Sequence, residues 1–372
     1  MFKDLKVLEL ASVLAGPSVG QFFAELGAEV IKIENLRTGG DITRSWKGAG
    51  EKSEDLSAYF CSCNWGKKSV AIDLDTNSGK KIIQKLIAQS DIVIASYKPG
   101  DAEKLGVSYE QLIHFNTQLI YGQITGYGSS NDRVGYDAVI QAESGFMELN
   151  GEKNGPPIKM PVALIDVLAG HQLKEGLLLA LLKKERTGVG SFVEVSLIQT
   201  AMASLVNQAT NWLVAKKLPT RQGSSHPNIA PYGDVFETRD GKRILLAVGT
   251  NRQFKDLLSI LQLDAMSLLP EYATNESRVV NRSALNDVLS TAIAKIESAE
   301  FLSMLHLSKV PAGLLQNVKE LFEMPEAKEM LIEYGSLIGV KGLAVSGLSN
   351  ESLTPPPMFG QHTDEILLRV HL

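Results

Sequence analysis

Asp166 is the residue whose surroundings in the sequence most directly indicate chemistry. It is the only charged residue in the apolar run 161–170, and removing a carboxylate from water costs several kcal/mol unless other groups compensate. Two interpretations are open. Aspartate at the start of the helix predicted over residues 167–186 would cap its free N–H groups. Alternatively, an ionised and half-desolvated carboxylate, positioned by the helix dipole, could act as a covalent nucleophile.

Other catalytic signatures are missing from the sequence. Proline stands between the glycines of the loop at residues 15–20, which is not the dinucleotide-binding pattern. No Walker A loop, Gly-x-Ser-x-Gly elbow or His-Glu-x-x-His pair is present, and the six histidines are scattered. Cys61 and Cys63 are too close for an ordinary disulfide, which fits a reducing compartment. We therefore expect no metal site and no nicotinamide cofactor.

The elements that must position Asp166 alternate between strands and helices in the first half of the chain. Periodicity predicts strands at 6–10, 29–33, 69–74, 91–95, 119–124 and 192–195, with helices at 19–26 and 79–89 between them. Such alternation indicates a mostly parallel sheet with helices on both faces. The sequence thus predicts a large Rossmann-like α/β domain over residues 1–200.

The second half predicts a smaller α+β domain over residues 226–317, after a turn-rich linker at 201–225. The Asp240-Gly241 pair between β-rich runs at 234–238 and 244–248 indicates a hairpin. Helical patterns follow at 253–261, 284–297 and 300–307. Residues 318–372 are interpreted as a return linker and a C-terminal segment that packs on the large domain, with a last helix at 364–370.

Composition excludes several classes of partner. The net charge of −5 and the pI near 5.8 provide no general attraction to nucleic acid or anionic membranes. No apolar stretch reaches the ~18–20 residues that span a bilayer, and the N-terminus enters a strand pattern without a signal peptide. A cytoplasmic location is the expectation, without nucleic-acid or membrane partners.

Several separated motifs, in consistent order and spacing, point to one family. They are VLELASVLAGP at 7–17, LGAEVIKIE at 26–34, GGDITR at 39–44, NWGKKSVAIDL at 64–74, YKPG at 97–100, GYG at 126–128, GYD at 135–137, HPNIAPY at 226–232, VPAG at 310–313 and GQHTDE at 360–365. Over nearly its whole length the chain resembles the class III CoA-transferases, also called the CaiB/BaiF or formyl-CoA transferase family.

The resemblance aligns Asp166 with the family's nucleophilic aspartate, about thirty residues after the GYD motif. It implies an aspartyl-acyl anhydride and then an aspartyl-CoA thioester on Asp166, with CoA esters as substrates and no tightly bound cofactor. The family's mobile glycine loop matches residues 222–226, which makes Gly223 a catalytic candidate. A plain interdomain linker is the alternative for that stretch.

The resemblance and the charge pattern together suggest the residues that bind CoA. Basic side chains beside strand ends suit the CoA phosphates, although each lysine could equally be a solvated surface charge. Tyr136 and Asp137 are further catalytic candidates and are expected to line the same pocket, with Tyr136 near the CoA tail and Asp137 as a polar or proton-handling group. A helix cap is the alternative for Asp137. The CoA-binding candidates are Leu14, Ala15, Arg37, Arg44, Lys67, Lys68, Lys98, Tyr136 and His226.

Departures from the family pattern limit the specificity. Trp65, Ser96 and Lys98 replace residues common in the family, which bears on the CoA contacts carried over from the resemblance. No long glycine run is present, and its absence disfavours formyl-CoA and oxalate as substrates. The α-methylacyl-CoA racemases of the same fold carry an acid/base histidine at the place of Tyr136, and a phenol substitutes poorly for it. A non-catalytic acyl-CoA-binding protein is the other alternative.

The region after His226 looks most like members that use succinyl-CoA. The resemblance also implies an interlocked homodimer, with the connections at 200–226 and 318–357 forming the crossings.

Overall fold

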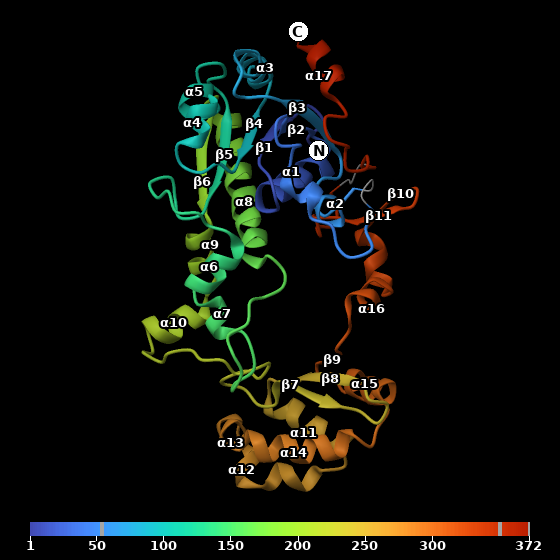
Figure 1. Ribbon diagram of the computed structural model, residues 1–372. Coiled ribbons are helices and arrows are strands. Elements are labelled where there is room, and N and C mark those ends of the chain that lie inside the picture. The colour runs from blue at the N-terminus through green and yellow to red at the C-terminus, as the bar shows by residue number, and fades with distance from the viewer. Residues whose placement is uncertain (53–55, 349–351, 371–372) are drawn as a thin grey trace. The chain divides into compact units, whose positions relative to one another are not determined.

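The structure is a computed structural model that describes residues 1–52, 56–348 and 352–370 (Figure 1). The chain forms two compact units. The first unit contains residues 1–147, 159–218 and 328–372, and the second contains residues 148–158 and 219–327. The chain therefore leaves the large unit twice and returns twice, because residues 148–158 belong to the second unit as well.

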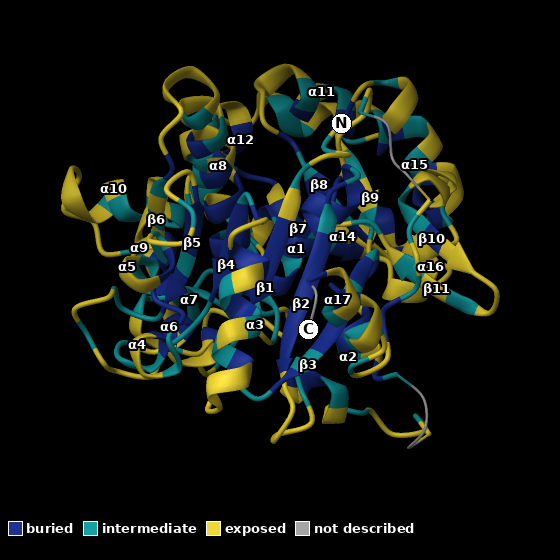
Figure 2. Ribbon diagram, turned by 90° about the horizontal axis from the view of Figure 1, so that it is seen from above, coloured by how far each residue is buried: buried dark blue, intermediate teal, exposed yellow. Residues whose placement is uncertain are grey.

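A six-stranded sheet in the order β3-β2-β1-β4-β5-β6 forms the centre of the large unit. Every neighbouring pair is parallel, and the order is that of a Rossmann sheet, which confirms the predicted α/β class. Strands β1, β2, β4 and β5 are largely buried, as β2 in Figure 2 illustrates, whereas β6 is partly exposed. The strands are β1 (Lys6–Leu10), β2 (Glu29–Asn35), β3 (Lys67–Ile72), β4 (Ile92–Ala95), β5 (Ile120–Thr125) and β6 (Ser191–Ser196).

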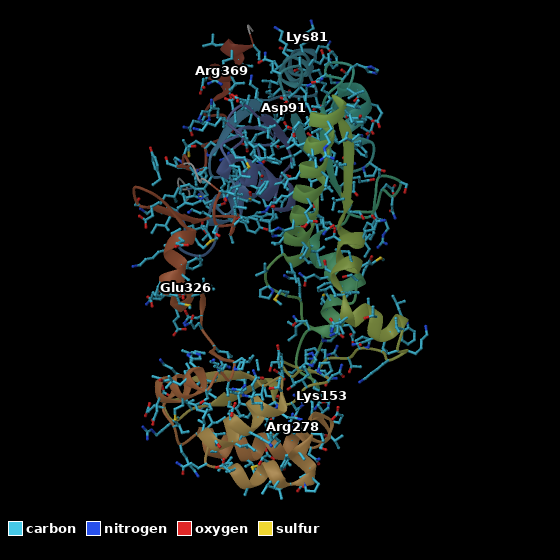
Figure 3. All side chains as sticks on the ribbon, turned by 180° about the vertical axis from the view of Figure 1, so that it is seen from behind. Lys81, Asp91, Lys153, Arg278, Glu326 and Arg369 are labelled. Carbon is cyan, nitrogen blue, oxygen red and sulfur yellow. The ribbon has the colours of Figure 1, made fainter. Side chains whose placement is uncertain are left out.

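Helices connect the strands of this sheet and surround the site described below. They are α1 (Ala15–Glu25), α2 (Ala58–Cys61), α3 (Asn77–Ile87), α4 (Asp101–Leu105), α5 (Tyr109–Leu112), α6 (Asp137–Glu143), α7 (Phe146–Leu149) and α8 (Leu164–Thr187), with a short 3-10 helix at Ile42–Ser45. Asp91, labelled in Figure 3, precedes β4 and accepts a hydrogen bond of 2.8 Å from Lys184 of α8. The long α8 is thereby fixed to the sheet near its C-terminal end.

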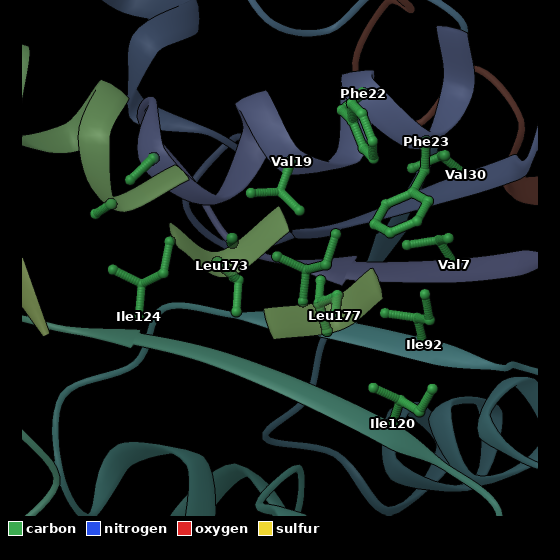
Figure 4. Close-up of a cluster of buried hydrophobic side chains, with 14 of the residues drawn as sticks. Val7, Val19, Phe22, Phe23, Val30, Ile92, Ile120, Ile124, Leu173 and Leu177 are labelled. Atoms are coloured by element: carbon green, nitrogen blue, oxygen red, sulfur yellow. The ribbon is translucent and has the colours of Figure 1, made fainter. Parts of the chain in front are cut away.

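Alternate strand residues contribute to separate cores on the two faces of the sheet. On one face Val7 and Ile92 pack with Phe23 of α1 and Leu173 and Leu177 of α8 (Figure 4). On the opposite face the neighbouring strand residues pack with residues of α3, α5 and the C-terminal helix α17 (Thr363–Arg369). Strand β4 is a continuous apolar run and β1 and β5 are mostly apolar, as expected for a parallel sheet buried on both faces.

Two expectations about the connections are wrong. Residues 201–218, predicted as part of a linker, carry the end of α9 (Leu197–Ser204) and α10 (Asn207–Leu213) and belong to the large unit. The return segment forms an unpredicted antiparallel hairpin of β10 (Leu331–Tyr334) and β11 (Leu337–Val340). Each of these strands has four residues, which is too short for a clear alternation of polar and apolar residues.

The second unit contains an antiparallel sheet in the order β7-β8-β9. The predicted hairpin is present, with Gly241 at φ +72° in its turn, and β9 was not predicted. Arg278, labelled in Figure 3, is 1% exposed and donates to the carbonyls of Ala230 and Tyr272. The elements are β7 (Tyr232–Glu237), β8 (Arg243–Ala247), β9 (Ala312–Leu314), α11 (Asn251–Ile260), α12 (Pro270–Ala273), α13 (Asn275–Val280), α14 (Arg282–Ile293), α15 (Ser298–Leu307) and α16 (Val318–Phe322), with 3-10 turns at Asp264–Leu268 and Pro325–Met330.

In the part of the chain that the structure describes, no helix combines the length and the apolar character needed to cross a bilayer.

Candidate active site

A cavity of about 350 Å³ lies in the large unit beside the carboxyl ends of β1, β4 and β5. In open α/β sheets, ligands bind outside the carboxyl ends of strands where the strand order changes direction, here between β1 and β4. Four predicted residues line this cavity together with Asp166: Leu14, Ala15, Lys98 and Tyr136. The cavity is therefore the candidate active site.

Asp166 lies in the first turn of α8, which begins three residues earlier than Val167. The capping interpretation is wrong in detail, because Ala163 occupies the N-cap position. Gly170, one turn further on, allows α8 to approach α1 closely: a β-carbon there would lie 2.5 Å from Ser18 Oγ and 3.2 Å from the Ala15 carbonyl oxygen. This close approach places the first turn of α8 beside the start of α1.

The side chain of Asp137 caps α8 from the neighbouring helix α6. Its Oδ1 accepts a hydrogen bond of 2.8 Å from the Ile165 N–H, and its Oδ2 accepts one of 2.7 Å from Gln141 Nε2. Asp137 itself is 8% exposed. Asp137 is therefore a helix cap, as the alternative expectation had it. The helix that it caps is α8, which carries Asp166.

The carboxylate of Asp166 has a perturbed proton affinity. Burial raises its pKa to about 7, and the nearby charge of Asp137 acts in the same direction. No donor in the described residues forms a hydrogen bond with this carboxylate. Burial raises the pKa of Tyr59 to about 12, and the charge of Asp166 adds to this effect. The Asp166 carboxylate is thus partly desolvated, accepts no hydrogen bond from the described residues, and loses its proton near neutral pH.

The predicted phosphate-binding cations are not gathered at the cavity. Lys67 is 1% exposed and contacts Glu9 at 2.8 Å and the Pro17 carbonyl oxygen at 2.8 Å, so it is corrected to a structural residue. Lys68 contacts Glu29 and Glu365. The reason is positional, since β3 begins two residues earlier than predicted and both lysines are its first residues, whereas the cavity lies at carboxyl ends.

Two arginines among the candidates are occupied elsewhere. Arg37 is exposed and forms an ion pair of 2.6 Å with Asp75. Arg44 donates to both oxygens of Glu34 and covers the ring of Phe60 at 3.7 Å. Neither arginine lines the cavity. Among the predicted lysines and arginines, Lys98 lines it, and its side chain is exposed.

Arg133 is a cavity residue that the sequence reasoning missed. Its guanidinium lies 4.2 Å from the centre of the Tyr127 ring and 2.5 Å from Glu143, and its side chain is about half exposed. Trp46 and Tyr97 also line the cavity. The only available signal for Arg133 was its place two residues before the GYD motif, and a single charge in a polar loop does not stand out.

Gly223 and His226 lie in the second unit and are described there. Gly223 has φ +65°, and its N–H donates to the Gly151 carbonyl at 3.2 Å. A β-carbon at Gly223 would lie 2.9 Å from Glu152 Oε2. The His226 N–H donates to the Tyr232 carbonyl at 2.8 Å, and its Nδ1 accepts from Asn228. The positive φ favours glycine at position 223.

The described residues contain no cluster of three or more His, Cys, Asp or Glu side chains that could hold a metal ion. A carboxylate in the wall of a cavity that an exposed lysine and a phenol also line is suited to acyl chemistry on that carboxylate.

Comparisons with known proteins identify the family of the chain. The model of a family described as CoA-transferase family III matches residues 2–363. The succinate–glutarate CoA-transferase of Agrobacterium fabrum is 36% identical over 98% of this chain and 94% of that protein. The human succinyl-CoA:glutarate CoA-transferase is 36% identical over 99% of this chain and 85% of that protein.

Solved structures give the same result. The crystal structure of a CaiB/BaiF family protein from Brucella suis superposes with a TM-score of 0.88 at 36% identity, covering 98% of both chains. The resemblance read from the motifs is confirmed: the chain belongs to CoA-transferase family III, the class III CoA-transferases.

Proposed function

We propose that this enzyme transfers CoA from a dicarboxylic acyl-CoA such as succinyl-CoA to a small carboxylic acid, with Asp166 as the covalent nucleophile. The observation that carries the proposal is the unpaired Asp166 carboxylate in the wall of a cavity of about 350 Å³. Relatives named for succinate, succinyl-CoA and glutarate support the dicarboxylic substrates.

Transfer proceeds by four exchanges at carbonyl groups. An oxygen of ionised Asp166 attacks the thioester carbonyl, the C–S bond breaks, and an aspartyl-acyl anhydride and CoA thiolate result. The thiolate attacks the aspartyl carbonyl, which releases the donor acid as a carboxylate and leaves an aspartyl-CoA thioester. The acceptor carboxylate then displaces the thiolate to form a second anhydride. Attack of the thiolate on the acceptor carbonyl gives the new acyl-CoA and regenerates Asp166.

The surroundings of Asp166 suit these intermediates. An anhydride is lost to hydrolysis if water reaches it, and the apolar neighbours of Asp166 limit that access. Asp137 keeps the first turn of α8 in place through its hydrogen bond to Ile165. Lys98 and Arg133, the basic residues of the cavity, provide charge for the anionic parts of the substrates. Gly223 and His226 belong to the loop that we propose covers the reaction.

Tyr136 distinguishes this proposal from racemisation. A racemase must remove and return a proton at the α-carbon, and a phenol with an ordinary pKa near 10 is a weak base at neutral pH. Tyr136 lines the cavity and is 61% exposed, so its hydroxyl can reach the substrate without serving as the base.

We further propose that the enzyme is a homodimer whose subunits interlock. Exposed apolar side chains occur on α8, α9, α10 and the residues next to them, and burial in a dimer interface would remove them from water. They are Leu178, Leu179, Leu182, Met202, Val206, Trp212, Leu213 and Val214. Light scattering on the purified protein tests this, and a monomer at micromolar concentration contradicts it.

The catalytic proposal is tested by incubating the enzyme with succinyl-CoA or acetyl-CoA and a panel of carboxylic acids, and by following new CoA esters by mass spectrometry. We expect transfer by the wild type and by the control Asp4→Asn, whose side chain is exposed and outside the cavity. We expect no transfer by Asp166→Asn. Intact mass after acyl-CoA addition should show a CoA adduct that Asp166→Asn lacks.

Other outcomes identify the alternatives. Exchange of the α-proton of a 2-methylacyl-CoA, without transfer to any acid, would replace the proposal by racemisation. Binding of CoA without exchange of any kind would show a binding protein.

A further inference from the structure

Four charged side chains lie buried behind the wall of the cavity. Glu9, Lys32, Asp41 and Lys67 are each at most 4% exposed. Lys32 Nζ contacts Glu9 Oε1 and Asp41 Oδ2, both at 2.9 Å, and Lys67 Nζ contacts Glu9 Oε2 at 2.8 Å. The two cations and two carboxylates form a connected chain without net charge, which we call the buried charge chain.

A glycine in α1 leaves the space that the buried charge chain occupies. Gly20 lies inside that helix, and a β-carbon there would lie 1.8 Å from Glu9 Oε2. Glycine is unfavourable in a helix interior, and buried ion pairs commonly stabilise a fold no better than apolar residues of similar size. These two features together indicate a role other than stability.

The end of the buried charge chain holds the backbone of Val13. Both carboxylate oxygens of Asp41 lie 3.3 Å from the Val13 N–H, which donates to them. The Cys63 thiol lies 3.6 Å from the Val13 carbonyl oxygen. The peptide groups on both sides of Val13 are thus fixed by side chains from other parts of the large unit.

Val13 needs such fixing because its φ is +73°. A β-branched residue with a left-handed backbone is a genuine outlier that persists only when its surroundings impose it. Asp41 and Lys32 provide that surrounding, and Lys32 also donates to the Ala11 carbonyl at 2.8 Å. The buried charge chain therefore holds the turn between β1 and α1 in a strained conformation.

The strained turn forms part of the cavity. Val13, Leu14 and Ala15 line it together with Asp166, and Gly170 brings α8 against the Ala15 carbonyl. We infer that Asp41, through the buried charge chain, is a positioning residue that fixes the turn at Val13 so that the cavity wall keeps one shape against the acyl group on Asp166. The inference rests on the proposed function for its kinetic part only.

The test compares Asp41→Asn with Glu25→Gln. Glu25 is a matched control, since its carboxylate is also buried, at 1% exposed, and also accepts backbone hydrogen bonds, but from the Gly342 and Leu343 N–H groups, which do not line the cavity. We expect Asp41→Asn to lower kcat about tenfold with KM for the acyl-CoA within about twofold, the pattern of a lost transition-state interaction. Glu25→Gln should keep kcat within about twofold while lowering Tm.

Amide hydrogen exchange without substrate separates this inference from the proposed function. We expect Asp41→Asn to exchange about tenfold faster in the segment 11–16, with other segments of the large unit unchanged, whether or not any CoA is transferred. If Asp41→Asn does not fold, Cys63→Ala tests the peptide group on the other side of Val13, with faster exchange expected in the same segment. Unchanged exchange in 11–16 overturns the inference.

A double-mutant cycle with Val13→Gly tests the coupling itself. Glycine adopts φ +73° without strain, so the turn depends less on Asp41 in that background. We expect Asp41→Asn to cost about tenfold in kcat in the wild type and only about twofold in Val13→Gly. Equal losses in both backgrounds, or equal losses of kcat in Asp41→Asn and Glu25→Gln, overturn the positioning role.

Discussion

Replacing the proposed nucleophile by asparagine should make the protein more stable. The pKa of Asp166 rises from 3.8 to about 7 in the folded protein, so the folded state binds this proton more tightly than the unfolded state. The ionised carboxylate therefore lowers the free energy of unfolding as pH rises from about 4 to about 7, and its full cost remains above pH 7. At about 1.4 kcal/mol for each pH unit, the cost reaches up to about 4 kcal/mol.

We expect about half of that cost, ~2 kcal/mol, because Asp166 faces the cavity and is only partly buried. Asparagine has nearly the same shape and no charge, so Asp166→Asn removes the cost together with the activity. Urea denaturation at pH 8 should show Asp166→Asn about 2 kcal/mol more stable than the wild type, and the difference should approach zero near pH 4. The control Asp4→Asn should stay within about 0.5 kcal/mol at each pH.

The pH dependence is what tests the reasoning. A variant that is no more stable than the wild type at pH 8 would show that Asp166 is not held in a costly environment. A gain of equal size at pH 4 and pH 8 would assign the stabilisation to packing and refute the electrostatic explanation.

Three further predictions concern the same unit. Because only the ionised form of Asp166 can attack, kcat/KM for the acyl-CoA should fall as pH is lowered through about 7, and a profile from pH 5.5 to 8.5 that stays flat would contradict this. Lys67→Met should lower the free energy of unfolding by about 3 kcal/mol, since Glu9 loses a buried partner, and should leave KM for the acyl-CoA unchanged. Lys98→Ala should raise that KM several-fold and leave the free energy of unfolding unchanged. The reverse pattern in kinetics and denaturation would contradict both assignments. Gly20→Ala should lower stability by about 3 kcal/mol despite the higher helix propensity of alanine, because of the 1.8 Å approach to Glu9 Oε2, and a neutral result in thermal unfolding would refute that clash.

Local periodicity was sufficient to predict most of the sheet and the class of fold. Strand β4 is a continuous apolar run, strands β1 and β5 are mostly apolar, and the helices between the strands carry apolar faces. Short elements were missed because four residues contain too little pattern, as in the hairpin β10 and β11. Residues 201–218 were misassigned because the helix α10 has only seven residues and its apolar side chains are exposed, so that no amphipathic pattern marks it.

The site was predictable where residues share a motif and unpredictable where they meet only in space. Asp166 was singled out by an apolar run and by the resemblance, and the structure places it in the cavity. Lys67 was misassigned because nothing in the local sequence shows that Glu9, 58 residues away, pairs with it inside the protein. The role of Asp137 as the cap of α8 likewise depends on a contact across 28 residues.

The edge of the sheet at β3 is closed by a segment from the far end of the chain. The His362 N–H donates to the Ser69 carbonyl, and the Ala71 N–H donates to Thr363 Oγ1. An uncovered edge strand is a template for pairing with other chains. During synthesis β3 emerges from the ribosome long before His362, which lies 293 residues after Ser69. The nascent chain therefore passes through a long period in which this edge is open, and chaperones or the folding rate must protect it until the covering segment arrives.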